Sequence, residues 1–182
     1  MTREAAVLII VAVALVLIGL GVWAWWRRTR RDSGFAAPVG DLPADAEVIA
    51  QVHGFYVATT RHDQPLERLA VRGLGFRSRV QITVASAGIL LELPGQPRML
   101  LPVARLVSVD QATVAIDRVV ERDGLTRVVW RIVRRDHEPS SGADEIVDTY
   151  LRPQDTSTRS LTDAIAGILP LQTSTTPTGS DA

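Results

Sequence analysis

Residues 76–84 read FRSRVQITV and decide the fold class of the chain around them. In an extended chain, positions 76, 78, 80, 82 and 84 share one face, and positions 77, 79, 81 and 83 share the other. The first face reads Phe-Ser-Val-Ile-Val and the second reads Arg-Arg-Gln-Thr. This period of two predicts an antiparallel strand with one face on a core and the other in water.

Short runs rich in β-branched residues recur on both sides of this stretch. They are residues 54–60, 66–71, 88–93, 99–101, 106–109, 114–121, 125–133 and 145–151. Pro94-Gly95 and Asp123-Gly124 supply hairpin turns between them. Trp130 is the only tryptophan beyond the N-terminal apolar segment, so we expect it to anchor the core.

A short helix is predicted to close the unit. Ser160, followed three residues later by Asp163, resembles an N-cap arrangement, and Pro170 ends the helical pattern. The apolar residues at helical spacing are Leu161, Ile165, Ile168 and Leu169. The sequence therefore predicts a mainly β fold, an antiparallel barrel or sandwich of about seven strands capped by a C-terminal helix.

The first 31 residues predict a membrane anchor. From Ala5 to Trp26 no residue is charged, and such a helix is about 33 Å long, close to the thickness of a hydrocarbon core. The expected interface residues are Trp23, Trp25, Trp26, Arg27, Arg28, Arg30 and Arg31. This basic cluster favours N-outside, C-inside topology, with the domain in the cytoplasm. A cleaved signal peptide would have a shorter apolar run and a basic cluster on its other side.

Composition excludes several classes of protein. The 20 basic and 20 acidic residues cancel overall, but the chain through Arg31 has five Arg and one Glu, a balance of +4, which leaves −4 for the rest. That net negative remainder argues against nucleic-acid binding. The lack of cysteine excludes disulfides, a thiolate nucleophile and a Cys-based zinc site.

The predicted organisation has five parts. Residues 1–4 are extracytoplasmic, 5–26 span the membrane, 27–45 form a basic juxtamembrane segment and linker, 46–171 fold, and 172–182 form a disordered tail.

The order of strands followed by one helix resembles the pleckstrin-homology-like (PH-like) superfold. The matching stretch runs through residues 80–84, 88–91, Pro94-Gly95, Leu101-Pro102 and 106–109. More closely, the chain resembles small actinobacterial single-pass membrane proteins with a PH-like domain, which are usually named only export, transporter or membrane protein. Residues 54–60, 73–77, 123–125, Trp130 and 148–152 carry that resemblance. It implies a fold and a location and no known chemistry.

Catalytic chemistry finds little support in the residues. His62-Asp63 and Asp136-His137-Glu138 place carboxylates beside imidazoles, but both stretches are turn-like, so we expect solvated loops. No metalloprotease, phosphate-loop or dinucleotide motif is present. We therefore predict no catalytic, cofactor-binding or metal-binding residue. The candidate anionic-ligand residues are Arg68, Arg72, Arg77 and Arg79, which surround a glycine turn.

These observations predict a membrane-anchored interaction or scaffold module at the cytoplasmic face of the plasma membrane, without catalysis. The expected partners are the bilayer, through residues 5–26, and a protein that is not identified; no nucleic acid is expected. The alternatives are a sensor of anionic phospholipid headgroups or a small ligand, and an accessory subunit of a transporter.

Overall fold

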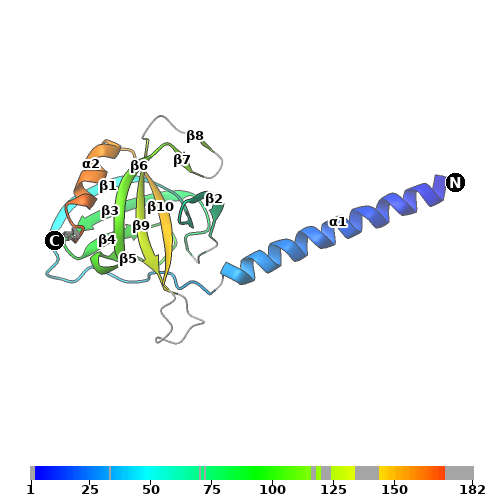
Figure 1. Ribbon diagram of the computed structural model, residues 1–182, viewed down its shortest axis with the longest axis horizontal. Helices are drawn as coiled ribbons and strands as arrows, with labels where there is room; N and C mark the ends of the chain where they lie inside the picture. The colour runs from blue at the N-terminus through cyan, green and yellow to red at the C-terminus, as the bar shows by residue number, and fades with distance from the viewer. Residues whose placement is uncertain are drawn as a thin grey trace, which may run out of the picture.

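The computed structural model describes residues 3–32, 34–69, 71, 73–115, 118–119, 124–133 and 144–170. The predicted tail, Arg72, Asp123 and His137 lie outside these residues. A long N-terminal helix projects from a β domain, and a second helix lies on the side of the domain away from it (Figure 1). The helices are α1 (Arg3–Asp32) and α2 (Thr158–Ala166). The strands are β1 (Val48–Arg61), β2 (Gln64–Arg68), β3 (Ser78–Ala85), β4 (Gly88–Glu92), β5 (Met99–Pro102), β6 (Leu106–Ala112), β7 (Val114–Ala115), β8 (Arg118–Val119), β9 (Leu125–Ile132) and β10 (Glu145–Pro153).

One antiparallel sheet of eight strands forms the domain. Its order is β5-β4-β3-β1-β10-β9-β6, with β2 paired to β1 beside this path. β7 and β8 form a separate two-stranded hairpin. The predicted mainly β fold with an N-terminal apolar helix and a C-terminal helix is confirmed. Gly95 has φ +72 in the turn between β4 and β5, as the predicted Pro-Gly hairpin requires.

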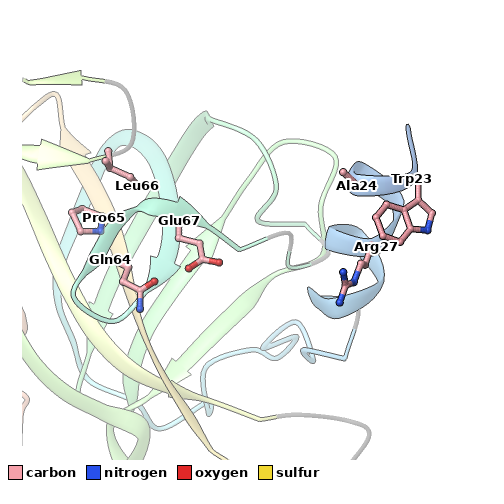
Figure 2. A pocket seen from close by; sticks show the side chains of 7 residues that line it. All are labelled: Trp23, Ala24, Arg27, Gln64, Pro65, Leu66 and Glu67. Atoms are coloured by element: carbon pink, nitrogen blue, oxygen red, sulfur yellow. The ribbon is translucent and has the colours of Figure 1, made fainter. Parts of the chain in front are cut away.

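Helix α1 contains one segment, Val7–Ala24, that is long and apolar enough to cross a membrane. The end of α1 lies across an open hollow from β2. Figure 2 shows Trp23, Ala24 and Arg27 on one side of this hollow and residues 64–67 on the other. The strand β2 is therefore the part of the sheet that lies beside the C-terminal end of α1.

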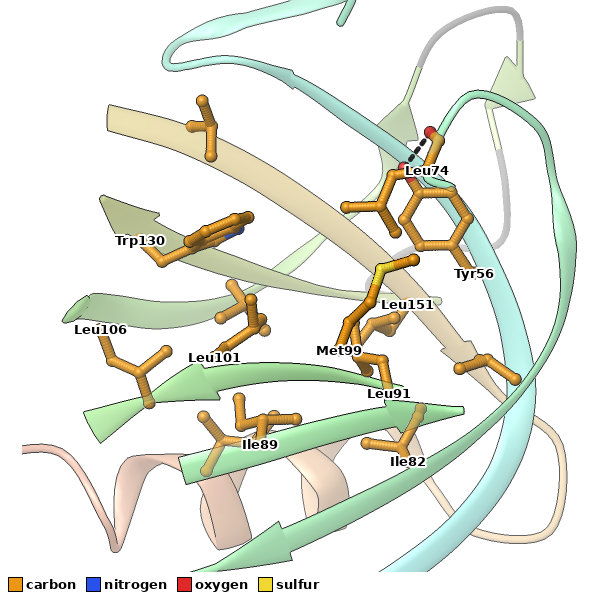
Figure 3. Close-up of a cluster of buried hydrophobic side chains, with 14 of the residues drawn as sticks. Tyr56, Leu74, Ile82, Ile89, Leu91, Met99, Leu101, Leu106, Trp130 and Leu151 are labelled. Carbon is orange, nitrogen blue, oxygen red and sulfur yellow. Dashed lines mark hydrogen bonds between the residues drawn. The ribbon is translucent and has the colours of Figure 1, made fainter. Parts of the chain in front are cut away.

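The core is built around Trp130 and Tyr56, both fully buried (Figure 3). The Tyr56 hydroxyl lies 2.7 Å from the carbonyl oxygen of Leu74 and 3.0 Å from Thr59 Oγ1. Thr59 Oγ1 lies 2.9 Å from Thr149 Oγ1, to which Trp130 Nε1 donates at 2.8 Å. A carbonyl oxygen only accepts, so Tyr56 donates to Leu74 and the direction of the whole chain is fixed. Trp130 donates to Thr149, Thr149 to Thr59, and Thr59 to Tyr56.

This chain of hydrogen bonds links β9, β10 and β1 to the loop before β3, and so joins residues that are distant in sequence. It contains no polar atom that depends on water, which suits a fully buried site. Burial also raises the pKa of Tyr56. The prediction that Trp130 anchors the core is confirmed.

Three sequence expectations differ from the structure in local detail. Phe76 was expected on the buried face of the 76–84 strand, but β3 starts at Ser78 and Phe76 is 84% exposed in the preceding loop. The N-cap of α2 is Ser157 and not Ser160, because the Ser157 side chain accepts a hydrogen bond from the Ser160 backbone N–H. Thr83, expected on the wet face, is buried.

Part of the predicted linker packs on the domain. Phe35 is only 3% exposed and belongs to the core. The Leu100 N–H donates to the Pro38 carbonyl, and the Gly40 N–H donates to the Arg98 carbonyl. These bonds cover the outer edge of β5 and add residues 35–40 to the folded unit that was predicted to begin at residue 46.

Candidate functional site

The four predicted anionic-ligand arginines have different environments. Arg68 donates from Nη1 to the Gly75 carbonyl at 2.8 Å and from Nη2 to the Val57 carbonyl at 2.6 Å. These two bonds hold the loop before β3 against β1, so Arg68 has a structural task. Arg72 lies outside the described residues.

Arg77 and Arg79 are exposed and lie beside the same aromatic ring. The Arg77 guanidinium lies 4.9 Å from the centroid of the Phe55 ring. Arg79 is the cross-strand partner of Phe55 in the β1–β3 pairing. Two cations therefore flank Phe55, as the predicted alternation of this strand would place them.

A shallow groove of about 610 Å³ adjoins Arg79. It is lined by His53, Gly54, Phe55, Val80, Gln81, Glu92, Leu93, Pro94 and Gln154 in addition to Arg79. The Glu92 carboxylate pairs with Arg98 Nε at 2.8 Å. Because Arg98 already compensates part of the Glu92 charge, Glu92 only partly reduces the attraction of Arg79 for a phosphate.

His53, at one end of this groove, is paired with Asp155. One carboxylate oxygen of Asp155 accepts from the His53 backbone N–H at 2.9 Å and lies 3.0 Å from His53 Nδ1. These interactions, the backbone bond foremost, hold the pKa of Asp155 below its usual value. The pair joins β1 to the segment after β10.

The expected membrane-interface residues lie on the last turns of α1. Arg27 sits 5.6 Å from the ring centroid of Trp23, and Trp26 is exposed. Trp25, Arg28, Arg30 and Arg31 are also in α1, but their side chains fall outside the described part. The cation and ring of Arg27 and Trp23 form the pairing expected at a headgroup boundary.

Sequence reasoning missed a polar cluster centred on Asp148, whose side chain is fully buried in β10. His62 Nδ1 lies 2.8 Å from Asp148 Oδ1, and the Asp63 backbone N–H donates to Asp148 Oδ2 at 3.2 Å. Arg127 Nη1 lies 3.6 Å from Asp148 Oδ2, while Arg127 also forms a bidentate pair with Asp110. Hydrogen bonding to Asp110 raises the pKa of Arg127. The expected turn at His62-Asp63 is present and Asp63 is exposed, but His62 is half-buried against Asp148 and is not solvated as expected.

Arg127 already compensates negative charge in this cluster. His62, Asp63 and Asp148 offer three ligand atoms within 4.8 Å of one another, a spacing that a metal ion can use. However, Arg127 Nη1 also lies 3.5 Å from Asp63 Oδ1, so a cation placed there would face a guanidinium. The arrangement fits a structural tie between the β1–β2 turn and strands β9 and β10. The only sequence signal for it was a carboxylate within the apolar strand 145–151.

The far end of the sheet presents a different surface. Within the described residues, β6 pairs only with β9 and so ends the sheet, whereas the opposite end, β5, is covered by residues 38–40. Helix α2 packs on β6, with Leu161 and Ile165 buried beneath it. Val109 on β6, Ala164 on α2 and Leu169 after it are half-buried apolar side chains at the margin of the core. A sheet edge beside an apolar helix flank is suited to binding an extended peptide.

Comparison with known proteins agrees with this architecture. No curated protein matches the chain significantly. A family described as bacterial PH domain-like matches residues 32–165, a range that runs from the end of α1 almost to the end of α2. Since this match covers most of the chain and all ten strands of its described part, the protein belongs to the bacterial PH-like domain family.

Proposed function

We propose that this protein is a membrane-tethered, non-catalytic interaction module, held at the cytoplasmic face of the plasma membrane by α1. Its working surface is the β6 edge beside α2, which accepts an extended segment of a protein partner by β-addition. The resemblance to actinobacterial single-pass proteins supports this location.

The anchor is supported by the composition and exposure of α1. The Val7–Ala24 segment has no charged residue, and none of it is buried against the domain. Exposed apolar side chains over this length need a hydrocarbon environment. The arginines that follow favour a cytoplasmic domain through the positive-inside rule.

The position of the peptide surface carries the proposal. Helix α2 lies on the side of the domain away from α1 (Figure 1), so a domain tethered by α1 would turn α2 and β6 toward the aqueous phase. Backbone groups of β6 other than those of Val107, which already has a partner, supply the hydrogen bonds, and the apolar flank of α2 supplies a surface for side chains.

The experiment is site-specific photo-crosslinking in membranes that contain the full chain. A photoreactive residue replaces Ser108 on β6, and a matched variant carries it at the exposed Arg131 on β9. The proposal expects a discrete protein adduct from position 108 that is at least several-fold weaker from position 131. Equal adducts from both positions, or none from position 108, would contradict it.

A headgroup sensor is the second candidate, favoured by the exposure of Arg77 and Arg79 beside Phe55. It predicts that the double variant Arg77→Glu/Arg79→Glu lowers retention on anionic vesicles relative to zwitterionic ones. If retention on both kinds of vesicle is unchanged, the headgroup-sensor function is contradicted and only the peptide-binding proposal remains.

A further inference from the structure

The connection between α1 and the domain is very short. Helix α1 continues for eight residues beyond Ala24, to Asp32, which adds about 12 Å of helix. Phe35 is already in the core of the domain, and the Ala36 N–H donates to the Val133 carbonyl at 3.0 Å. Only residues 33 and 34 lie between the end of α1 at Asp32 and Phe35, so the connection reaches about 11 Å at most when extended. The domain is thus confined close to any bilayer that α1 crosses.

The surface beside the C-terminal end of α1 is formed by β2 and the loop that follows it. Trp23, Ala24 and Arg27 share a hollow of about 910 Å³ with residues 64–67 (Figure 2). Trp23 and Ala24 lie at the end of the apolar segment, where the headgroups begin. The Arg68 bond to the Gly75 carbonyl ties Gly75, the residue before Phe76, to the end of this same strand.

Two large apolar side chains are exposed on this surface. Leu66 on β2 is 69% exposed, and Phe76 is more exposed than any other large apolar side chain in the described residues. Arg77 follows Phe76 directly and is also exposed. The one acidic side chain lining the hollow, Glu67, is half-buried and lies 3.6 Å from Arg61 Nε, so its charge is partly compensated. Apolar side chains flanked by cations are typical of surfaces that rest on an anionic bilayer.

We propose that this surface, formed by Leu66, Phe76 and Arg77, docks on the bilayer that α1 crosses, with Phe76 entering the boundary between headgroups and acyl chains. The occupant is the membrane because the short connection holds this face beside it. Tethering places the surface at a high effective lipid concentration, so a contact too weak to recruit a free domain is sufficient here. Docking fixes the orientation of the domain and keeps α2 turned toward water.

The inference rests on the anchor in the proposed function, and its test separates the two. The chain has no cysteine, so a single cysteine gives a unique labelling site for a fluorophore. One version carries the label at Leu15, within the apolar segment, and another at Gln64, which is exposed on β2. A third carries it at Arg159, which is exposed on α2. Each full-length chain is reconstituted, one copy per nanodisc, in phosphatidylcholine with phosphatidylglycerol.

The readout is quenching by lipids spin-labelled either at the headgroup or at the acyl-chain end. Docking predicts strong headgroup-level quenching at Gln64 and little at Arg159. In the Gln64-labelled chain, Phe76→Ser is expected to lower the ratio of docked to undocked domain about tenfold or more. The matched control is Val48→Ser. Val48 is another exposed apolar residue but pairs with Ala85, about 23 Å along β3 from Ser78, so quenching at Gln64 is expected to stay unchanged.

The outcomes distinguish the two claims. Loss of chain-end quenching at Leu15 would overturn the anchor itself. Quenching at Leu15 together with equal, weak quenching at Gln64 and Arg159 would overturn the docking surface alone. Equal effects of Phe76→Ser and Val48→Ser would also overturn it. Quenching at Gln64 that appears only when several chains share a bilayer would assign this surface to a second copy and contradict the proposal.

Discussion

Replacing Tyr56 by Phe removes one oxygen from the middle of the buried hydrogen-bond chain. The Leu74 carbonyl loses its donor, and the Thr59 hydroxyl loses its acceptor. A buried carbonyl left without a partner costs about 1–3 kcal/mol, and the lost net hydrogen bond costs about 1 kcal/mol. Because these contributions overlap, we expect the free energy of unfolding to fall by about 2–3 kcal/mol.

Thr59→Val is the informative companion, since it keeps the shape of the side chain. In this variant Tyr56 still donates to Leu74, so no carbonyl is stranded, but the Thr149 hydroxyl loses its acceptor, and the expected loss is about 1–2 kcal/mol. The double variant should lose less than the sum of the two single losses, because both changes break the same bond. Urea unfolding of the full chain in detergent, followed by far-ultraviolet circular dichroism, measures all three. With a slope of about 2 kcal/mol per molar urea, Tyr56→Phe lowers the midpoint by about 1 M or more. If Tyr56→Phe costs no more than Thr59→Val, the assigned direction of the chain is wrong.

Three further variants test other parts of the structure in the same unfolding assay. Asp148→Asn keeps the size of a fully buried side chain but removes its charge beside Arg127, so we expect a loss of about 2–3 kcal/mol; a loss under about 0.5 kcal/mol would contradict the structural role of that cluster. Gly54→Ala places a Cβ 2.4 Å from the Arg152 carbonyl oxygen, so β1 and β10 must separate at a cost of about 1–3 kcal/mol; wild-type stability would show that the strands do not approach this closely. The lowered pKa of Asp155 means that its stabilising effect is present above the unfolded pKa near 3.8 and is lost as pH falls through the folded pKa. Asp155→Asn is therefore expected to reduce the acid sensitivity of unfolding, and an unchanged pH profile would count against the pairing with His53.

The strands and turns were predictable because their signals are local. The alternation in residues 76–84 and the Pro94-Gly95 turn depend on neighbouring residues only. Phe76 was misplaced because alternation does not report where a strand begins, and the Arg68 bond to Gly75 draws the preceding residues into a loop. That bond joins two positions whose proximity no periodicity indicates.

The Asp148 cluster was beyond prediction for a related reason. It depends on the register of β1 with β10 and of β10 with β9, which brings residues 62, 148 and 127 together from three parts of the chain. Pairing register is a tertiary property set by the whole sheet. The prediction of the α2 N-cap was wrong for a more local reason. Ser157 and Ser160 can both cap a helix, and only the backbone direction at the helix start selects between them.

The packing of Phe35 was hidden by the composition around it. Glycine and proline in residues 34–43 are typical of a linker, yet one aromatic side chain and a few backbone bonds attach residues 35–40 to the domain. This attachment replaces the predicted flexible linker by a short connection. The domain is therefore held close to α1, with β2 beside the C-terminal end of the helix.

The tethering of the domain at the cytoplasmic face is tested most directly by thiol labelling of the full chain, carrying a single cysteine in place of Arg159, in intact cells. Arg159 is exposed on α2, and the chain has no other cysteine. A membrane-tethered domain on the cytoplasmic side predicts that the protein sediments with membranes and reacts with a membrane-impermeant maleimide only after the cells are permeabilised. Labelling in intact cells, or recovery of the chain in the soluble fraction, would contradict it.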